Sequence, residues 1–171
     1  LPGGQMVVLT GLLQRAESAD EVAGVMAHEI SHVTERHGLR SVARQLGITL
    51  LFAWFLGDAG AAAQLGGQIA ASVRSNSYSR DQESDADARG LRLMRRAGFN
   101  GYGMSDFFRH MQQRGEGELP SGLAWLSTHP DHESRIRAIE GRLGGVQRGS
   151  SGVLAAEFAA MQTALGGRKA D

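Results

Sequence analysis

The stretch His28-Glu29-Ile30-Ser31-His32 has the pattern H-E-x-x-H, and the rest of the chain can be interpreted outward from it. On an α-helix, residues four apart differ by about 400° of turn and about 6 Å of rise, so both imidazoles point to the same side. This arrangement suits one Zn²⁺ ion with nitrogen ligands at about 2.0–2.1 Å. Glu29 lies between the histidines, where it can act as general base on a water molecule. We therefore predict a metal site with His28 and His32 as ligands.

The residues around this motif are mostly small and apolar. Glu21–Ala27 leads into the motif, and Ile30 and Val33 continue the apolar pattern. This pattern predicts a buried helix that carries three ionisable side chains. Buried charge is costly unless it is paired, and a metal ion would offset that cost. The alternative is a pair of ordinary surface or core histidines.

Composition narrows the class of protein. A chain of 171 residues with many Gly and Ala and few aromatic residues predicts one domain of closely packed helices. Eighteen basic and eighteen acidic residues balance, and no basic block is present, which argues against nucleic acid as a main partner. Polypeptide and membrane-surface partners stay open. Because the chain has no cysteine, any metal must be held by histidines and carboxylates.

The pattern of turns and caps predicts a mainly α fold with a small β element, that is, a mainly α (α+β) chain. Gln5–Gly11 is β-like and predicts an edge strand, which could pair with an upstream strand and an extended peptide or be purely structural. Leu1–Gly4 does not resemble a signal peptide, so we expect residues upstream of this chain. The predicted helices begin at a capping box at Ser18 and run to about Leu46, then cover Ser79–Gly98, Met104–Gln113, Pro130–Leu143 and Val153–Leu165.

The longest apolar run is Leu46–Gly57, which ends at Asp58. It is well short of the roughly 20 residues that a membrane-spanning helix needs. We predict that it lies in a soluble domain. The alternative is an interfacial or re-entrant segment that touches lipid.

A catalytic zinc ion usually has a third protein ligand. The pattern H-E-x-x-H-x-x-G-x-x-H is excluded, because Glu35 and Gly38 stand where it needs glycine and histidine. His37 lies nine residues after His28, about 900° of turn, and so would face away on the same helix. We predict that His37 is a surface or second-layer residue.

Glu83 is the best candidate for the third ligand. Asp87 follows four residues later on the same helix face, where it could accept the free N–H of a ligating histidine. The alternative is a solvated acidic face, since Asp81 and Asp85 are nearby.

Four motifs in one order resemble the gluzincin metallopeptidases, the family that includes the CaaX prenyl endopeptidases, HtpX, BepA and the mitochondrial OMA peptidase. They are L-P-G-G-x-x-x-V at 1–8, H-E-I-S-H at 28–32, S-R-x-x-E-x-x-A-D at 79–87 and T-H-P-x-x-x-x-R-I at 128–136. The resemblance implies that His28, His32 and Glu83 bind zinc, that Glu29 is the base and that Asp87 orients a ligand histidine.

The resemblance also implies a place at the mouth of the active site for His129 and Arg135. His129 would either stabilise an oxyanion or fill the open zinc position and inhibit the enzyme. Arg135 would anchor this segment or assist the oxyanion, and the alternative for both is a structural loop. His110 and His132 receive no functional role. The chain lacks the membrane helices of HtpX and the prenyl endopeptidases, so it resembles the soluble BepA-like branch.

These observations predict one metallopeptidase domain over residues 1–171, a zinc-dependent metalloendopeptidase that hydrolyses polypeptides bound as an extended strand near Val7 and Val8. We expect one zinc ion per chain, possible contact with a membrane surface and a bacterial envelope, periplasmic location in protein quality control. The alternative function is a zinc-containing chaperone or scaffold that binds unfolded chains and seldom cleaves them.

Overall fold

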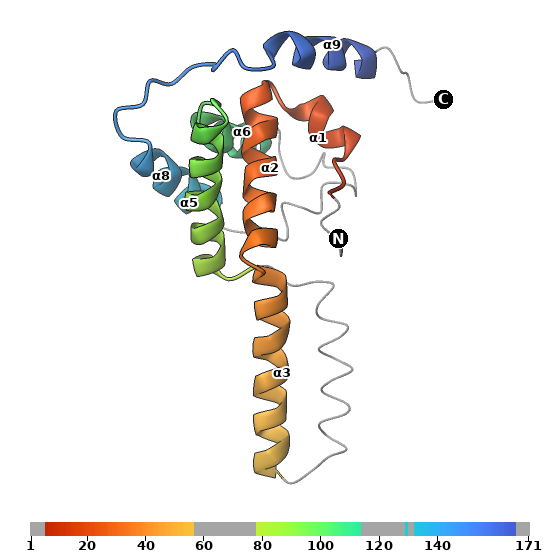
Figure 1. Ribbon diagram of the computed structural model, residues 1–171, viewed down its shortest axis with the longest axis vertical. Helices are drawn as coiled ribbons and strands as arrows, with labels where there is room; N and C mark the ends of the chain where they lie inside the picture. Colours follow the sequence, from red (N-terminus) through yellow and green to blue (C-terminus); the bar gives the residue numbers. More distant parts are fainter. Residues whose placement is uncertain (1–5, 57–77, 114–128, 130–131, 167–171) are drawn as a thin grey trace.

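The structure is a computed structural model that describes residues 6–56, 78–113, 129 and 132–166 (Figure 1). All regular secondary structure in these residues is helical, which confirms the mainly α prediction. The helices are α1 (Thr10–Arg15), α2 (Ala19–Thr34), α3 (His37–Leu56), α5 (Arg80–Arg96), α6 (Tyr102–Gln113), α8 (His132–Arg142) and α9 (Ala155–Gly166).

The predicted strand Gln5–Gly11 does not appear in the part of the chain that is described. Residues 6–9 have no regular structure, and Thr10 and Gly11 already belong to α1. A strand is stable only beside another strand, and the described residues supply no neighbour. The β-like residue pattern alone was therefore insufficient evidence for a strand.

Helix α2 begins as predicted but ends twelve residues early. Ser18 is its N-cap, and the Ser18 hydroxyl accepts a hydrogen bond from the backbone N–H of Glu21 at 3.2 Å. The helix ends at Thr34 because Arg36 has a left-handed backbone, with φ of 54°. A separate helix, α3, starts at His37 and projects away from the other helices (Figure 1). The predicted single helix to Leu46 is wrong.

Helix α5 has both predicted ends. Ser79 and Gln82 form a complete capping box at its start. At its end Gly98 has φ of 82°, and its N–H donates to the carbonyl of Arg95, while the N–H of Phe99 donates to Met94. These are the two hydrogen bonds of a Schellman motif, which explains why the helix stops there.

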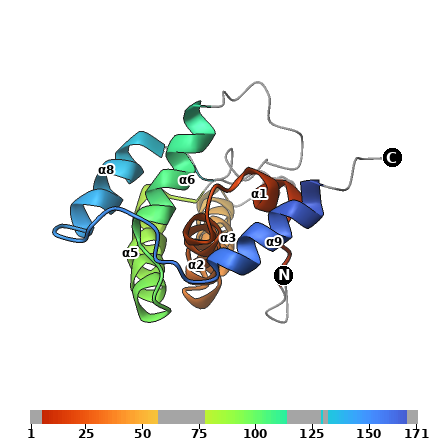
Figure 2. The same cartoon turned by 90° about the horizontal axis from the view of Figure 1, so that it is seen from above.

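Helix α2 lies at the centre and packs against α5 and α6, and α8 packs against α5 and α6 in turn (Figure 2). Two glycines permit the contact between α2 and α6. A Cβ atom on Gly24 would lie 2.7 Å from the Cα of Met104, and one on Gly103 would lie 2.4 Å from the backbone oxygen of Asp20. The core that results is formed by Ala27, Leu91, Met94, Met104, Phe108, Ile136, Ile139 and Leu143.

The remaining predicted helices are present with shifted bounds. Met104, Phe107, Phe108 and Met111 of α6 are buried as expected, and so are the isoleucines of α8. The last helix, α9, has no buried residue and lies across the end of α1 and α2 (Figures 1 and 2). Predictions on Leu1–Gly4, Gly57 and Pro130 fall outside the described residues.

The apolar run that begins at Leu46 forms the outer part of α3. The large side chains described in this part are exposed rather than packed, with Trp54 at 83% and Phe55 at 81%. Among the described residues, no helix combines the length and the hydrophobicity needed to cross a membrane.

Candidate metal centre

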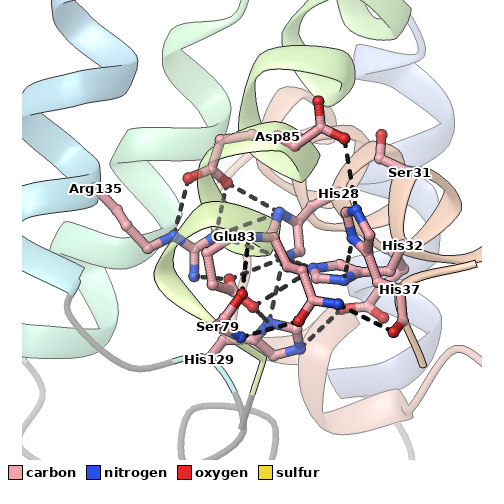
Figure 3. Close-up of polar contacts among 12 residues, drawn as sticks. His28, Ser31, His32, His37, Ser79, Glu83, Asp85, His129 and Arg135 are labelled. Carbon is pink, nitrogen blue, oxygen red and sulfur yellow. Dashed lines mark hydrogen bonds and ion pairs between the residues drawn. The ribbon is translucent and has the colours of Figure 1, made fainter. Parts of the chain in front are cut away.

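Four buried side chains from three separate segments meet beside α2 (Figure 3). His28 and His32 come from α2, Glu83 comes from the first turn of α5, and His129 precedes α8. One donor atom from each lies within 4.8 Å of the others. The predicted third ligand, Glu83, therefore lies with the two histidines and not on a solvated acidic face.

The distances between these donor atoms fit a single small cation. The Nε2 atom of His28 lies 2.9 Å from Nε2 of His32 and 3.2 Å from Nδ1 of His129. The carboxylate of Glu83 lies 3.4 Å from His28 and 3.5 Å from His32. Four donors around a tetrahedral Zn²⁺ with bonds of about 2.0–2.1 Å lie about 3.3–3.4 Å apart. The residues present therefore fit a zinc ion held by nitrogen and oxygen.

Asp87, the predicted partner of a ligand histidine, contacts His28. Its Oδ1 atom lies 2.9 Å from Nδ1 of His28, so the Nδ1–H group can donate to the carboxylate and Nε2 faces the cluster. An unprotonated Nε2 is the form that binds a metal ion.

Arg135 is buried against the carboxylates rather than at an open mouth. Its Nε and Nη2 atoms donate to the two oxygens of Asp87 at 2.9 and 2.6 Å, and Nη1 lies 2.7 Å from Oε2 of Glu83. The guanidinium also stacks 4.5 Å from the ring centre of Phe108. This bidentate geometry holds both carboxylates in place.

The second histidine, His32, meets His37. Their Nδ1 atoms are 3.1 Å apart, and His37 is only 2% exposed. The expectation that His37 faces away on the same helix is wrong, because the break at Arg36 places His37 on α3. The other half of the prediction, a second-layer residue, agrees with the structure.

Glu29 lies at the more open side of the cluster. Its side chain is 34% exposed, and Oε1 lies 3.4 Å from Nε2 of His129. His129 contacts Glu83 through its other nitrogen, with Nδ1 2.9 Å from Oε1. The His129 ring thus stands between the predicted base and a predicted ligand.

Burial and charge set the protonation of the cluster. Burial and the neighbouring histidines lower the pKa of His32 to about 2, so the ring is a neutral donor. Although burial acts in the opposite direction, hydrogen bonds from His129 and His28 hold the pKa of Glu83 well below its usual range. Burial also opposes the ionised form of Asp87, but His28 and Arg135 lower its pKa as well. Neutral imidazoles and ionised carboxylates are the ligand forms that zinc requires.

Several neighbours were missed from the sequence. The ring of Tyr78 stacks 3.9 Å from that of His32, and Asp85 lies 3.5 Å from His37. Tyr78 stands next to the capping box, which was the only signal that could have drawn attention to it. The histidines without an assigned role lie elsewhere, His110 beside Glu17 and Glu21 and His132 beside Phe108.

Comparison with known protein families matches residues 1–143 to peptidase family M48. The match covers most of the 171 residues, and the chain belongs to this family. The sequence resemblance is thus confirmed at the level of the family.

Individual relatives agree with this assignment. The chain is 34% identical to the mitochondrial metalloendopeptidase OMA1 of Schizosaccharomyces pombe, over 82% of this chain and 41% of that protein. It is 36% identical to a putative β-barrel assembly-enhancing protease of Vibrio cholerae (78% and 30%) and 32% identical to the β-barrel assembly-enhancing protease of Escherichia coli (82% and 31%). The chain therefore spans between 30% and 41% of the length of these relatives.

Proposed function

We propose that this protein is a zinc-dependent metalloendopeptidase of the gluzincin type, with residues 1–171 forming one catalytic domain. The observation that supports this most is the cluster of His28, His32 and Glu83, in which the donor atoms lie at distances that suit a tetrahedral ion. A buried group of this kind is costly without an ion to bind. Membership of a peptidase family supports the assignment independently.

The chemistry follows from the side chains. Zinc, when bound, would polarise the scissile carbonyl and make a water molecule a better nucleophile. Glu29, partly exposed beside the cluster, takes the proton of the attacking water and passes it to the leaving amine. Asp87 accepts the Nδ1 proton of His28 and so directs Nε2 toward the cluster, and Arg135 anchors Asp87 and Glu83.

For His129 we propose an inhibitory role rather than oxyanion binding. Its Nδ1 atom lies among the ligand atoms, 3.2 Å from His28 and 2.9 Å from Glu83. A nitrogen there competes for the position that a catalytic zinc site leaves open for water or substrate.

The substrate is proposed to be a polypeptide in extended form. Val7 and Val8 are exposed, and they are the residues along which the substrate was expected to lie, although they form no strand. Similarity to β-barrel assembly-enhancing proteases supports protein quality control in a bacterial envelope, in the periplasm. One relative, OMA1 of Schizosaccharomyces pombe, is mitochondrial by name, so a mitochondrial location is the alternative to the proposed one.

A contact with a membrane surface is also proposed, through α3. The helix contains no acidic residue, its inner half carries Arg40 and Arg44, and its outer half is apolar and exposed. Basic and apolar side chains in this order suit the surface of an anionic bilayer.

The test combines metal analysis with one substitution. The wild-type protein should bind one zinc ion per chain, lose it to a chelator and cleave an unfolded protein substrate only when zinc is present. Glu29→Gln should keep the zinc and lose cleavage by at least about 10²-fold, since it removes only the base. Full cleavage by Glu29→Gln would refute the mechanism, and wild-type protein without zinc would refute the site.

The alternative is a zinc-containing chaperone or scaffold. The position of His129 among the ligands favours it, because a fourth protein ligand leaves no place for water. This alternative predicts zinc, binding of unfolded chains and no cleavage in either the wild type or His129→Ala.

A further inference from the structure

The two ligand histidines need the same tautomer but meet different partners. A histidine that binds metal through Nε2 carries its proton on Nδ1, and a partner for that proton fixes the ring. At His28 the partner is the carboxylate of Asp87, 2.9 Å away. At His32 the partner is another imidazole, since Nδ1 of His37 lies 3.1 Å from Nδ1 of His32.

Two ring nitrogens can share a hydrogen bond only when one carries the proton and the other does not. If His32 donates from Nδ1, then His37 must accept at Nδ1 and carry its own proton on Nε2. That nitrogen points toward Asp85, with Nε2 3.5 Å from Oδ2 (Figure 3). Asp85 therefore favours the one tautomer of His37 that can accept from His32.

Other residues hold both Asp85 and His37 in place by hydrogen bonds and ion pairs. The guanidinium of Arg89 donates to both oxygens of Asp85, at 3.1 and 3.0 Å, and its Nη1 atom lies 2.6 Å from Glu35. The backbone carbonyl of His37 accepts from Nε2 of Gln82 at 3.0 Å. The left-handed backbone of Arg36 is what turns the chain so that His37 can enter the buried layer.

We propose that His37 is a positioning residue for the metal centre: it accepts the Nδ1 proton of His32, and Asp85 holds His37 in the tautomer that can do so. The inference rests on the proposed function, because it assigns a role relative to zinc. It gives the break after Thr34 a role, because the break brings His37 to His32. Two of the four carboxylates of α5 would then orient the two ligand histidines, Asp87 directly and Asp85 through a second ring.

The test measures zinc affinity rather than cleavage, by competition with a chromophoric chelator. His37→Phe, which keeps a ring but has no acceptor, should weaken zinc binding by about 10- to 100-fold, as loss of an outer partner does in other zinc sites. His37→Gln, which keeps an acceptor oxygen, should restore affinity to within a few-fold of the wild type. Asp85→Asn should weaken it less than His37→Phe. The matched control is Asp81→Asn, which removes an exposed carboxylate from the same helix and should change nothing.

A second measurement does not depend on the folding of any variant. In nitrogen-15 NMR spectra of the zinc-loaded wild type, His37 should carry its proton on Nε2, and its Nδ1 atom should be unprotonated. The opposite tautomer would overturn the proposal, and so would wild-type affinity in His37→Phe. If the wild type bound no zinc, the proposed function would fail. If it bound zinc and His37→Phe bound it equally well, only this inference would fail.

Discussion

Among single residues, His129 is the one of the four donors that does not lie on a described helix. His28, His32 and Glu83 stand on α2 and α5, whereas His129 contacts Glu29 as well as the other donors. Under the proposed inhibitory role, its ring fills space that a substrate carbonyl would need. The balance between a closed and an open position of this one side chain would then set how much enzyme is active.

Replacement of His129 by alanine should therefore raise peptide cleavage at saturating zinc. We expect a gain of about ten-fold, because a closed state favoured by about 1.4 kcal/mol leaves roughly one molecule in ten open. The control is His132→Ala, which removes a histidine beside the ring of Phe108 and should leave the rate unchanged. A fall in the rate of His129→Ala would instead indicate the oxyanion role.

At the scale of elements, the close packing of α2 against α6 fixes how these two helices lie relative to each other. Asp20 at the start of α2 accepts hydrogen bonds from the N–H groups of Asn100 and Ser151, at 2.8 and 2.9 Å. The backbone of the same residue, Asp20, is packed against Gly103 of α6. The close contact is possible only without a side chain at position 103.

Gly103→Ala should lower the free energy of unfolding by about 1–3 kcal/mol, because the new Cβ meets backbone that cannot give way. Urea denaturation followed by circular dichroism measures this change. The control is Gly141→Ala in α8, where nothing lies within 4 Å, and alanine there should be neutral or stabilising by up to about 1 kcal/mol. Equal effects of the two substitutions would contradict this account of the packing.

At the scale of the whole molecule, α3 is set apart from the packed body (Figure 1). It contacts α2 at its inner end, and its outer end presents Trp54 and Phe55. Exposed aromatic residues at the end of a basic helix are costly in water and favourable at the headgroup level of a bilayer.

The protein should therefore co-sediment with vesicles of phosphatidylglycerol and much less with vesicles of phosphatidylcholine. The double substitution of Trp54 and Phe55 by serine should weaken this binding several-fold, because it removes two large exposed apolar side chains at the end of α3. Leu39→Ser is the control, since Leu39 is also exposed on α3 but lies near the body. Equal loss in the control, or equal binding to both lipids, would argue against insertion of the end of the helix.

Much of this protein could be predicted from the residues themselves, because the signals are local. The spacing of His28 and His32 needs only a helix to bring the rings together, and the caps at Ser18, Ser79 and Gly98 satisfy backbone groups within one turn. The grouping of Glu83 with the two histidines was also expected, since a catalytic zinc ion usually has a third protein ligand and a carboxylate can supply it.

Tertiary structure alone decided the rest. No local signal marks Arg36 as a break, because neither glycine nor proline stands there, and the left-handed turn is held by contacts of Glu35 and His37 with α5. The same contacts brought Asp85 to His37. The β-like run before Thr10 formed no strand in the described residues, because pairing needs a partner that a single segment cannot supply. Local periodicity determines which groups a helix presents, whereas only packing between distant segments determines what those groups meet.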